Sequence, residues 1–168
     1  FLAELDNEAK VTRSCLERVP AEKFDWKPHE KSMTMGRLAV HCAEMFGWTK
    51  ETLKSDVLDF ATMDYIPFEP KSTEELLAFF DDHIAKAKVI LAETPDETFF
   101  TDWTMRNGEQ VYMTLPKVAV MRSFVMNHII HHRGQHGLHR AAHRFAHEPE
   151  PCDLMNPVCL RARMPGNR

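Results

Sequence analysis

The chain has 168 residues, of which 43% are hydrophobic and 27% charged, a balance that fits one globular domain with a single core and excludes a largely disordered chain. A formal net charge of −4 gives no broad basic surface, so we expect no nucleic-acid partner. The sequence shows neither an apolar run of about 18 residues nor a basic-then-apolar leader, so we expect a cytoplasmic protein with no membrane partner.

Two amphipathic helices are predicted in the first third of the chain. In residues 2–19 apolar side chains recur at alternating three- and four-residue steps, and Pro20 ends this helix. After a proline-containing connector, the Thr34 hydroxyl can cap a second helix that we expect to continue to about Lys54. The inward face of this second helix would carry Leu38, His41 or Cys42, Met45 and Trp48.

A third helix and a hairpin are predicted in the middle of the chain. Ser72 and Glu75 match a capping box, in which each side chain satisfies a backbone N–H group of the other residue, and an apolar stripe follows. Within 99–116 two alternating runs flank the dipeptide Asn107-Gly108, which is typical of a tight turn. We therefore predict a small β-hairpin before the last helix.

A fourth helix would begin near Pro116, because proline is tolerated in a first helical turn. Its inward face would carry Val118, Met121, Val125, His128 and His132. Four amphipathic segments joined by loops and one hairpin predict an all-α protein, a four-helix bundle over residues 1–147. The prolines after His147 occur without a periodic apolar set, so we expect residues 148–168 to form an irregular C-terminal tail.

Three histidines form a candidate metal site. His128 and His132 are four residues apart, so on a helix they project from one face, and they continue the apolar stripe of the fourth helix. His41 falls on the inward face of the second helix. Three neutral imidazoles suit a divalent ion, most simply zinc or nickel. The alternative is that His41 is a core histidine and that His128 and His132 line a wet groove without metal.

Two segments carry a resemblance to a known family. WKPHEKSMTMGRLAVHCAEMFGW around His41 and NHIIHHRGQ around His132 resemble, in order and separation, the DinB-like (DinB/YfiT) superfamily over about residues 1–135. The resemblance implies an up-down-down-up bundle whose divalent metal is held by His41, His128 and His132. Many such proteins are dimers, which makes a homodimer an expectation here.

The resemblance also implies an activity. Members resemble thiol S-transferases that use bacillithiol, mycothiol or glutathione, so the expected partners are a small-molecule thiol and an electrophile. Glu44, Gln135 and Trp48 are candidates for orienting the ligands or lining the pocket, although each also fits an ordinary solvated or core position. A different class of function stays open, namely a metal-binding stress protein without turnover or a damaged family copy.

The sequence changes character after Gln135. We expect the resemblance to end there, and we expect His131 and His136 to be exposed. Helical spacing continues through His132, His136, His139, His143 and His147. Two hypotheses remain for this segment: a larger histidine-metal cluster, or a shifted reading frame that replaces the native end. Cys15, Cys42, Cys152 and Cys159 form no CxxC pair, which favours free thiols over a zinc knuckle or a disulfide framework.

Overall fold

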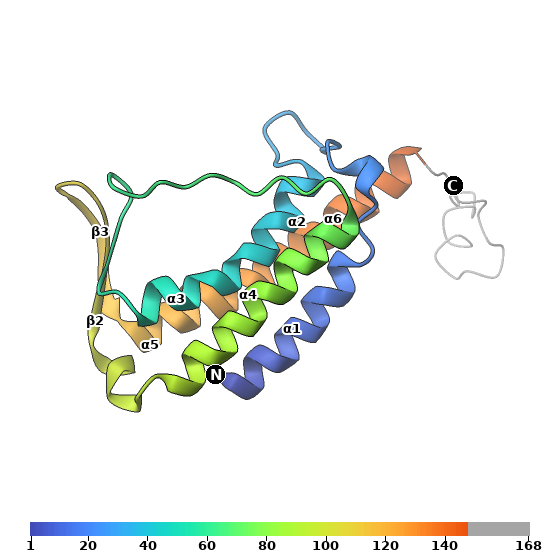
Figure 1. Cartoon of the computed structure of the whole chain (residues 1–168). Helices are drawn as coiled ribbons and strands as arrows, with labels where there is room; N and C mark the ends of the chain where they lie inside the picture. The colour runs from blue at the N-terminus through green and yellow to red at the C-terminus, as the bar shows by residue number, and fades with distance from the viewer. Residues whose placement is uncertain (148–168) are drawn as a thin grey trace, which may run out of the picture.

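The structure is a computed structural model that describes residues 1–147, so the predicted tail lies outside the described residues (Figure 1). The helices are α1 (Leu2–Leu16), α2 (Met35–Glu44), α3 (Trp48–Leu53), α4 (Thr73–Glu93), α5 (Lys117–Val120) and α6 (Asn127–His147). Short 3-10 turns occur at Ala21–Lys23, Met45–Gly47 and Asp96–Phe100, and Met121–Met126 is π-helical. The strands are β1 (Val57–Asp59), β2 (Asp102–Asn107) and β3 (Gln110–Pro116).

The helices form the predicted four-helix bundle with up-down-down-up topology (Figure 1). α1 runs in one direction, and α2 with α3 returns beside it. A long crossing segment then carries the chain back along the bundle, so that α4 runs in the same direction as α2. The last segment, α5 to α6, runs back again and brings its histidines beside α2.

Two predicted caps begin their helices. The Thr34 hydroxyl accepts a hydrogen bond from the Arg37 backbone N–H at 3.1 Å, and the Ser72 hydroxyl accepts one from Glu75 at 3.2 Å. Each bond satisfies one of the N–H groups that a first helical turn leaves free. The reciprocal half of the predicted capping box differs, because the Glu75 carboxylate accepts from the Lys71 N–H at 2.8 Å instead of from Ser72.

The second predicted helix is not continuous. It divides at the 3-10 turn Met45–Gly47 into α2 and α3. Gly47 has a low helix propensity, and its missing side chain lets α4 approach closely, since a Cβ there would lie 2.6 Å from the His83 Cδ2 atom. Gly47 thus allows the 3-10 turn to pack closely against α4.

The β-hairpin is found, but it belongs to a three-stranded sheet. β2 and β3 pair antiparallel, while β1 adds to β2 in parallel, with Leu58 opposite Met105. The strand Val57–Asp59 was not predicted, because three residues are too few to show an alternating pattern. The turn residues between β2 and β3 are Gly108, whose φ is 57°, and the residue after it, one position later than predicted.

The core lies between the four helices and continues beneath the sheet. Its largest fully buried side chains include Phe46, Phe80, Leu5, Met121 and Ile129. A smaller cluster, formed by Leu58, Trp103, Met105 and Val120, holds the sheet against the end of the bundle. Among the residues that the structure describes, no helix is long and apolar enough to cross a membrane.

Candidate metal centre

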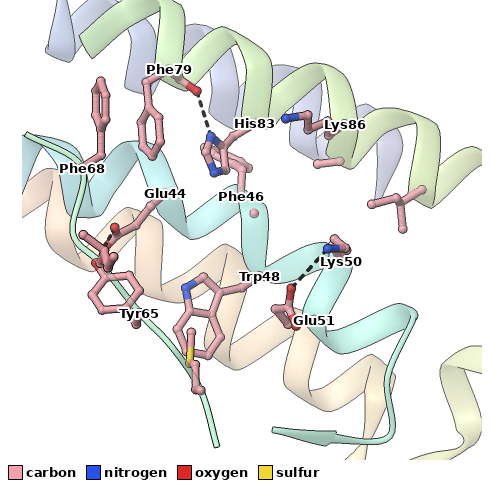
Figure 2. Close-up of a pocket in the computed structure, with 15 residues that line it drawn as sticks. Glu44, Phe46, Trp48, Lys50, Glu51, Tyr65, Phe68, Phe79, His83 and Lys86 are labelled. Carbon is pink, nitrogen blue, oxygen red and sulfur yellow. Dashed lines mark hydrogen bonds and ion pairs between the residues drawn. The ribbon is translucent and has the colours of Figure 1, made fainter. Parts of the chain in front are cut away.

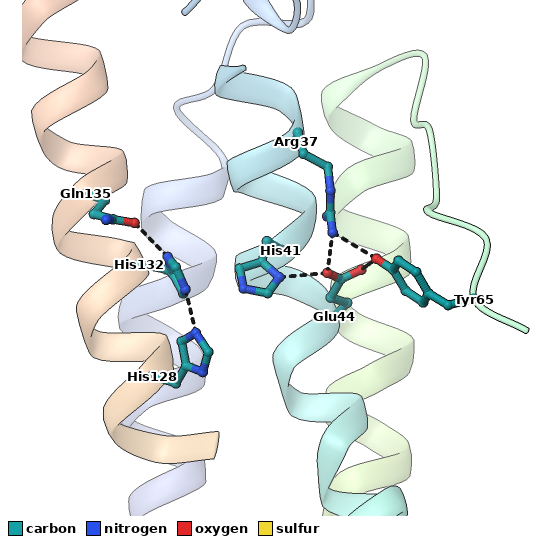
Figure 3. Close-up of polar contacts among 7 residues, drawn as sticks. All are labelled: Arg37, His41, Glu44, Tyr65, His128, His132 and Gln135. Carbon is teal, nitrogen blue, oxygen red and sulfur yellow. Dashed lines mark hydrogen bonds and ion pairs between the residues drawn. The ribbon is translucent and has the colours of Figure 1, made fainter. Parts of the chain in front are cut away.

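Three imidazole rings from two helices meet inside the bundle (Figure 3). His41 projects from α2, and His128 and His132 project from successive turns of α6. One ring nitrogen of each lies within 4.8 Å of the others, and the Nε2 atoms of His128 and His132 are 2.6 Å apart. Imidazole nitrogens that share a tetrahedral ion at about 2.0 to 2.1 Å lie about 3.3 Å from each other. Because all three nitrogens lie within 4.8 Å of one another, small adjustments of the rings would let the side chains share one metal ion.

A π-helical segment precedes the pair on α6. Met121–Met126 has a wider turn than an α-helix, and both Val125 and Met126 are buried in it. Val118, which we expected to face inward, is half-buried, whereas Lys117 and Val120 are buried. The α-helical register resumes at Asn127, and from there His128 and His132 occupy one face.

The outer nitrogens of the three rings are bonded to the protein. His41 Nδ1 lies 2.7 Å from a Glu44 carboxylate oxygen, and His132 Nδ1 lies 2.7 Å from the Gln135 side-chain oxygen. His128 is hydrogen-bonded to the backbone of Phe124. An oxygen of this kind accepts, so Nδ1 of His41 and His132 donates and the Nε2 lone pair of each is available to an ion.

Burial keeps the paired histidines neutral. The pKa of His128 is lowered to about 4, chiefly by burial and in addition by the neighbouring His132 and His41. Burial also lowers the pKa of His132, an effect that the hydrogen bond with Gln135 opposes in part. A metal ligand must be unprotonated, so both shifts favour the ligand form at neutral pH.

Glu44 is the centre of a polar network on the outer side of His41 (Figure 3). Its carboxylate accepts from an Arg37 guanidinium N–H at 3.0 Å and from the Tyr65 hydroxyl at 2.7 Å, besides the His41 ring. Burial raises the pKa of Glu44, but these three hydrogen bonds outweigh it and the net pKa is lowered. Burial and the neighbouring Glu44 raise the pKa of Tyr65 to about 12, so this hydroxyl keeps its proton.

Sequence reasoning missed two members of this network. Arg37 lies four residues before His41 on α2, a spacing that places both on one helical face, and this signal was available. Tyr65 lies in the crossing segment after β1, where no periodicity relates a residue to a distant helix. The sequence therefore contained no signal for Tyr65.

The ring of Phe124 lies between Trp48 and the histidines. Its indole packs against Phe124 with centroids 6.3 Å apart, and Phe124 packs against His128 at 5.7 Å. Trp48 also lines a separate cavity between α3 and α4. It therefore supports the site indirectly, through the ring of Phe124.

The histidines after Gln135 are arranged differently from our expectation. His131 is exposed as predicted, but His136 is only 1% exposed, so the prediction of an exposed His136 was wrong. α6 continues to His147 and turns His136 and His143 toward the other helices, because the helical spacing is maintained. Within residues 1–147, neither ring nitrogen of His136 has a hydrogen-bond partner.

A larger histidine-metal cluster is not formed by the side chains that the structure describes. Among them, the one group with metal-ligand spacing is His41, His128 and His132. His139 instead lies within hydrogen-bond distance of the backbone oxygens of Gln135 and Met33.

The cysteines within the described residues are free thiols, as expected. Cys15 is half-buried and Cys42 is buried. Burial raises the pKa of Cys42 to about 12, so its thiol is not a nucleophile near neutral pH. Cys152 and Cys159 lie outside the described residues.

Comparison with known proteins bears on the family. The model of the DinB family matches residues 1–157, which extends past Gln135, where we expected the resemblance to end. A crystal structure of a DinB-like protein (YjoA) from Bacillus subtilis matches with a TM-score of 0.64 and 17% identity, covering 87% of this chain and 92% of that one. No curated protein matches the chain in sequence. Because the family match spans nearly the whole chain and the fold agrees, the chain belongs to the DinB family.

Proposed function

We propose that this protein is a divalent-metal-dependent thiol S-transferase, with zinc or nickel as the ion. The observation that carries the proposal is the convergence of three neutral imidazoles from two helices, with ring nitrogens within 4.8 Å. Three protein ligands are one fewer than the four that close a structural zinc site, so the donor set is of the catalytic kind.

A bound divalent ion would supply a Lewis acid that lowers the pKa of a substrate thiol. In the transfer, the thiol sulfur forms a bond to the electrophilic carbon, the bond from that carbon to its leaving group breaks, and the thiol proton passes to solvent. The resemblance to thiol transferases, rather than any contact in the structure, suggests this reaction and its small-molecule substrates.

The residues of this chain would act by holding and orienting the imidazoles. Glu44 and Gln135 accept from the outer nitrogens of His41 and His132, which fixes the ring orientation and directs both Nε2 atoms inward. Arg37 and Tyr65 in turn hold the Glu44 carboxylate. Cys42 is excluded as the attacking group because its buried thiol stays protonated.

The test is a thiol-transfer assay with glutathione and chlorodinitrobenzene, in which free thiol and the coloured adduct are both measured. We expect turnover that requires added zinc or nickel, that a chelator abolishes, and that the variant His132→Ala lacks. The exposed neighbour His131 provides the matched control, since His131→Ala should retain both fold and activity. Turnover by His132→Ala equal to that of the unaltered protein would contradict the metal mechanism.

The same assay separates the second class of function. A metal-binding protein without turnover would bind zinc through the same three histidines yet show no thiol loss with a series of electrophiles. Zinc binding measured on the same sample therefore distinguishes a non-catalytic metal protein from a protein that lacks the metal site altogether.

A further inference from the structure

A cavity of about 540 Å³ lies beside α3 and α4 (Figure 2), and none of the three clustered histidines lines it. Its walls come from the end of α2, from α3, from α4 and from the crossing segment after β1. Glu44 and Tyr65 stand at one edge of the cavity, and the Glu44 carboxylate separates it from His41.

The walls are mainly aromatic and apolar. Phe68 and Phe79 stack with their ring centroids 4.3 Å apart and their planes inclined by 11°, and Phe79 lies 4.2 Å from the His83 ring. Phe46 and Met63 also line the space. Such walls favour a flat aromatic body, because aromatic rings gain from stacked and edge contacts in addition to the area that they bury.

The charged side chains around the cavity are already paired. Lys86 forms an ion pair with Asp82 at 2.5 Å, and Lys50 lies 3.9 Å from Glu51. Glu44 is paired with Arg37. Because each charged side chain has a partner of opposite sign, no unbalanced charge lines the cavity. An uncharged occupant is therefore favoured over an ionic one.

Two polar atoms remain available among the uncharged lining side chains. His83 Nδ1 donates to the Phe79 carbonyl at 2.8 Å, so its Nε2 is a hydrogen-bond acceptor, and Figure 2 shows this ring pointing into the cavity. The Trp48 indole N–H is a donor. Within the described part of the chain, neither His83 Nε2 nor Trp48 Nε1 has a recorded hydrogen bond, whereas the Tyr65 hydroxyl is already bonded to Glu44 and Arg37.

We propose that this cavity is a second small-molecule site that binds an uncharged aromatic molecule bearing a hydroxyl group, with the hydroxyl donating to His83 Nε2. Gly47 is part of the site, because a Cβ there would lie 3.1 Å from that nitrogen and cover it. This proposal does not rest on the thiol-transfer proposal.

The test compares naphthol with methoxynaphthalene, which have the same ring body but differ in the hydroxyl donor. Binding is measured by equilibrium dialysis at about pH 8 with a chelator present. We expect naphthol to bind about three- to tenfold more tightly, which is the contribution of one neutral hydrogen bond.

Variants at His83 decide whether this nitrogen is the acceptor. His83→Leu should remove the difference between the two ligands, whereas His83→Gln, whose amide oxygen can accept, should restore part of it. His29→Leu, on the exposed connector, is the matched control, and thermal melting establishes that each variant folds. Equal binding of the two ligands to the unaltered protein, an undiminished preference in His83→Leu, or no binding of either ligand would overturn the proposal.

Discussion

Replacement of Glu44 tests whether the polar network on the outer side of His41 supports metal binding. Glu44 is only 11% exposed, and its carboxylate bonds to His41, Arg37 and Tyr65. The substitution Glu44→Gln retains the shape and one oxygen acceptor but removes the negative charge. His41 then becomes a weaker ligand, and the half-buried Arg37 loses its ionic partner.

The expected effect is at the lower end of the range known for groups that orient metal ligands. Such substitutions reduce metal affinity about 10- to 100-fold. Because the glutamine oxygen can still accept from His41 Nδ1, we expect about a tenfold loss of zinc affinity, equivalent to about 1.4 kcal/mol. The substitution removes the contribution of the carboxylate charge to zinc affinity and retains the hydrogen bond to His41.

The assay is competition for zinc against a chromophoric chelator at fixed pH, with circular dichroism to establish that the helices are intact. Glu51→Gln is the matched control, because Glu51 is 42% exposed and its recorded ionic partner is Lys50. Its zinc affinity should equal that of the unaltered protein. A Glu44→Gln affinity within twofold of the unaltered protein, with the fold preserved, would refute the reasoning.

Three further outcomes are expected. Zinc at about 100 times its dissociation constant should stabilise the protein by about 2.7 kcal/mol, a rise of about 5 to 10 °C in Tm, and His132→Ala should show no rise; an equal rise would remove His132 from the site. The pKa of His136 is about 4 in the folded chain against 6.5 when exposed, so only the unfolded chain binds this proton between those values and stability falls as pH drops from 6.5 to 4. Urea titrations of His136→Leu should show a pH dependence smaller by up to about 3 kcal/mol, and superimposable pH profiles would disprove this. Gly108→Ala should lower the free energy of unfolding by about 1 to 2 kcal/mol because φ is 57°, and an unchanged melting curve would contradict that cost.

The fold could be predicted where the signal was local. Helical periodicity and the Thr34 and Ser72 caps located the bundle, because a cap depends on residues within one turn of itself. β1 could not be predicted, since its parallel pairing with β2 joins residues far apart in sequence and leaves no mark in a three-residue strand. The break at Gly47 depends on the approach of His83, which is also a tertiary contact.

The candidate site was likewise predictable only where helix geometry alone determines which way a side chain points. The inward faces of two helices were enough to bring His41, His128 and His132 together, because helix geometry fixes where each side chain points. The Glu44 network required Tyr65, which comes from an irregular segment. His136 was misjudged because an imidazole was assumed to prefer water, whereas its position on α6 turns it inward.

The segment between β1 and α4 forms part of the cavity wall, whereas the three histidines come from packed helices, so the two regions can be altered separately. The three histidines lie on packed helices, where a substitution disturbs neighbours on several sides. One wall of the cavity, by contrast, is formed by Met63, Tyr65, Ile66 and Phe68 from the irregular segment after β1, in which Ile66 is 82% exposed. Exposed connecting segments tolerate substitution and insertion far better than packed helices do. Substitutions at Ile66 and Phe68 can therefore change the lining of the cavity without altering His41, His128 or His132.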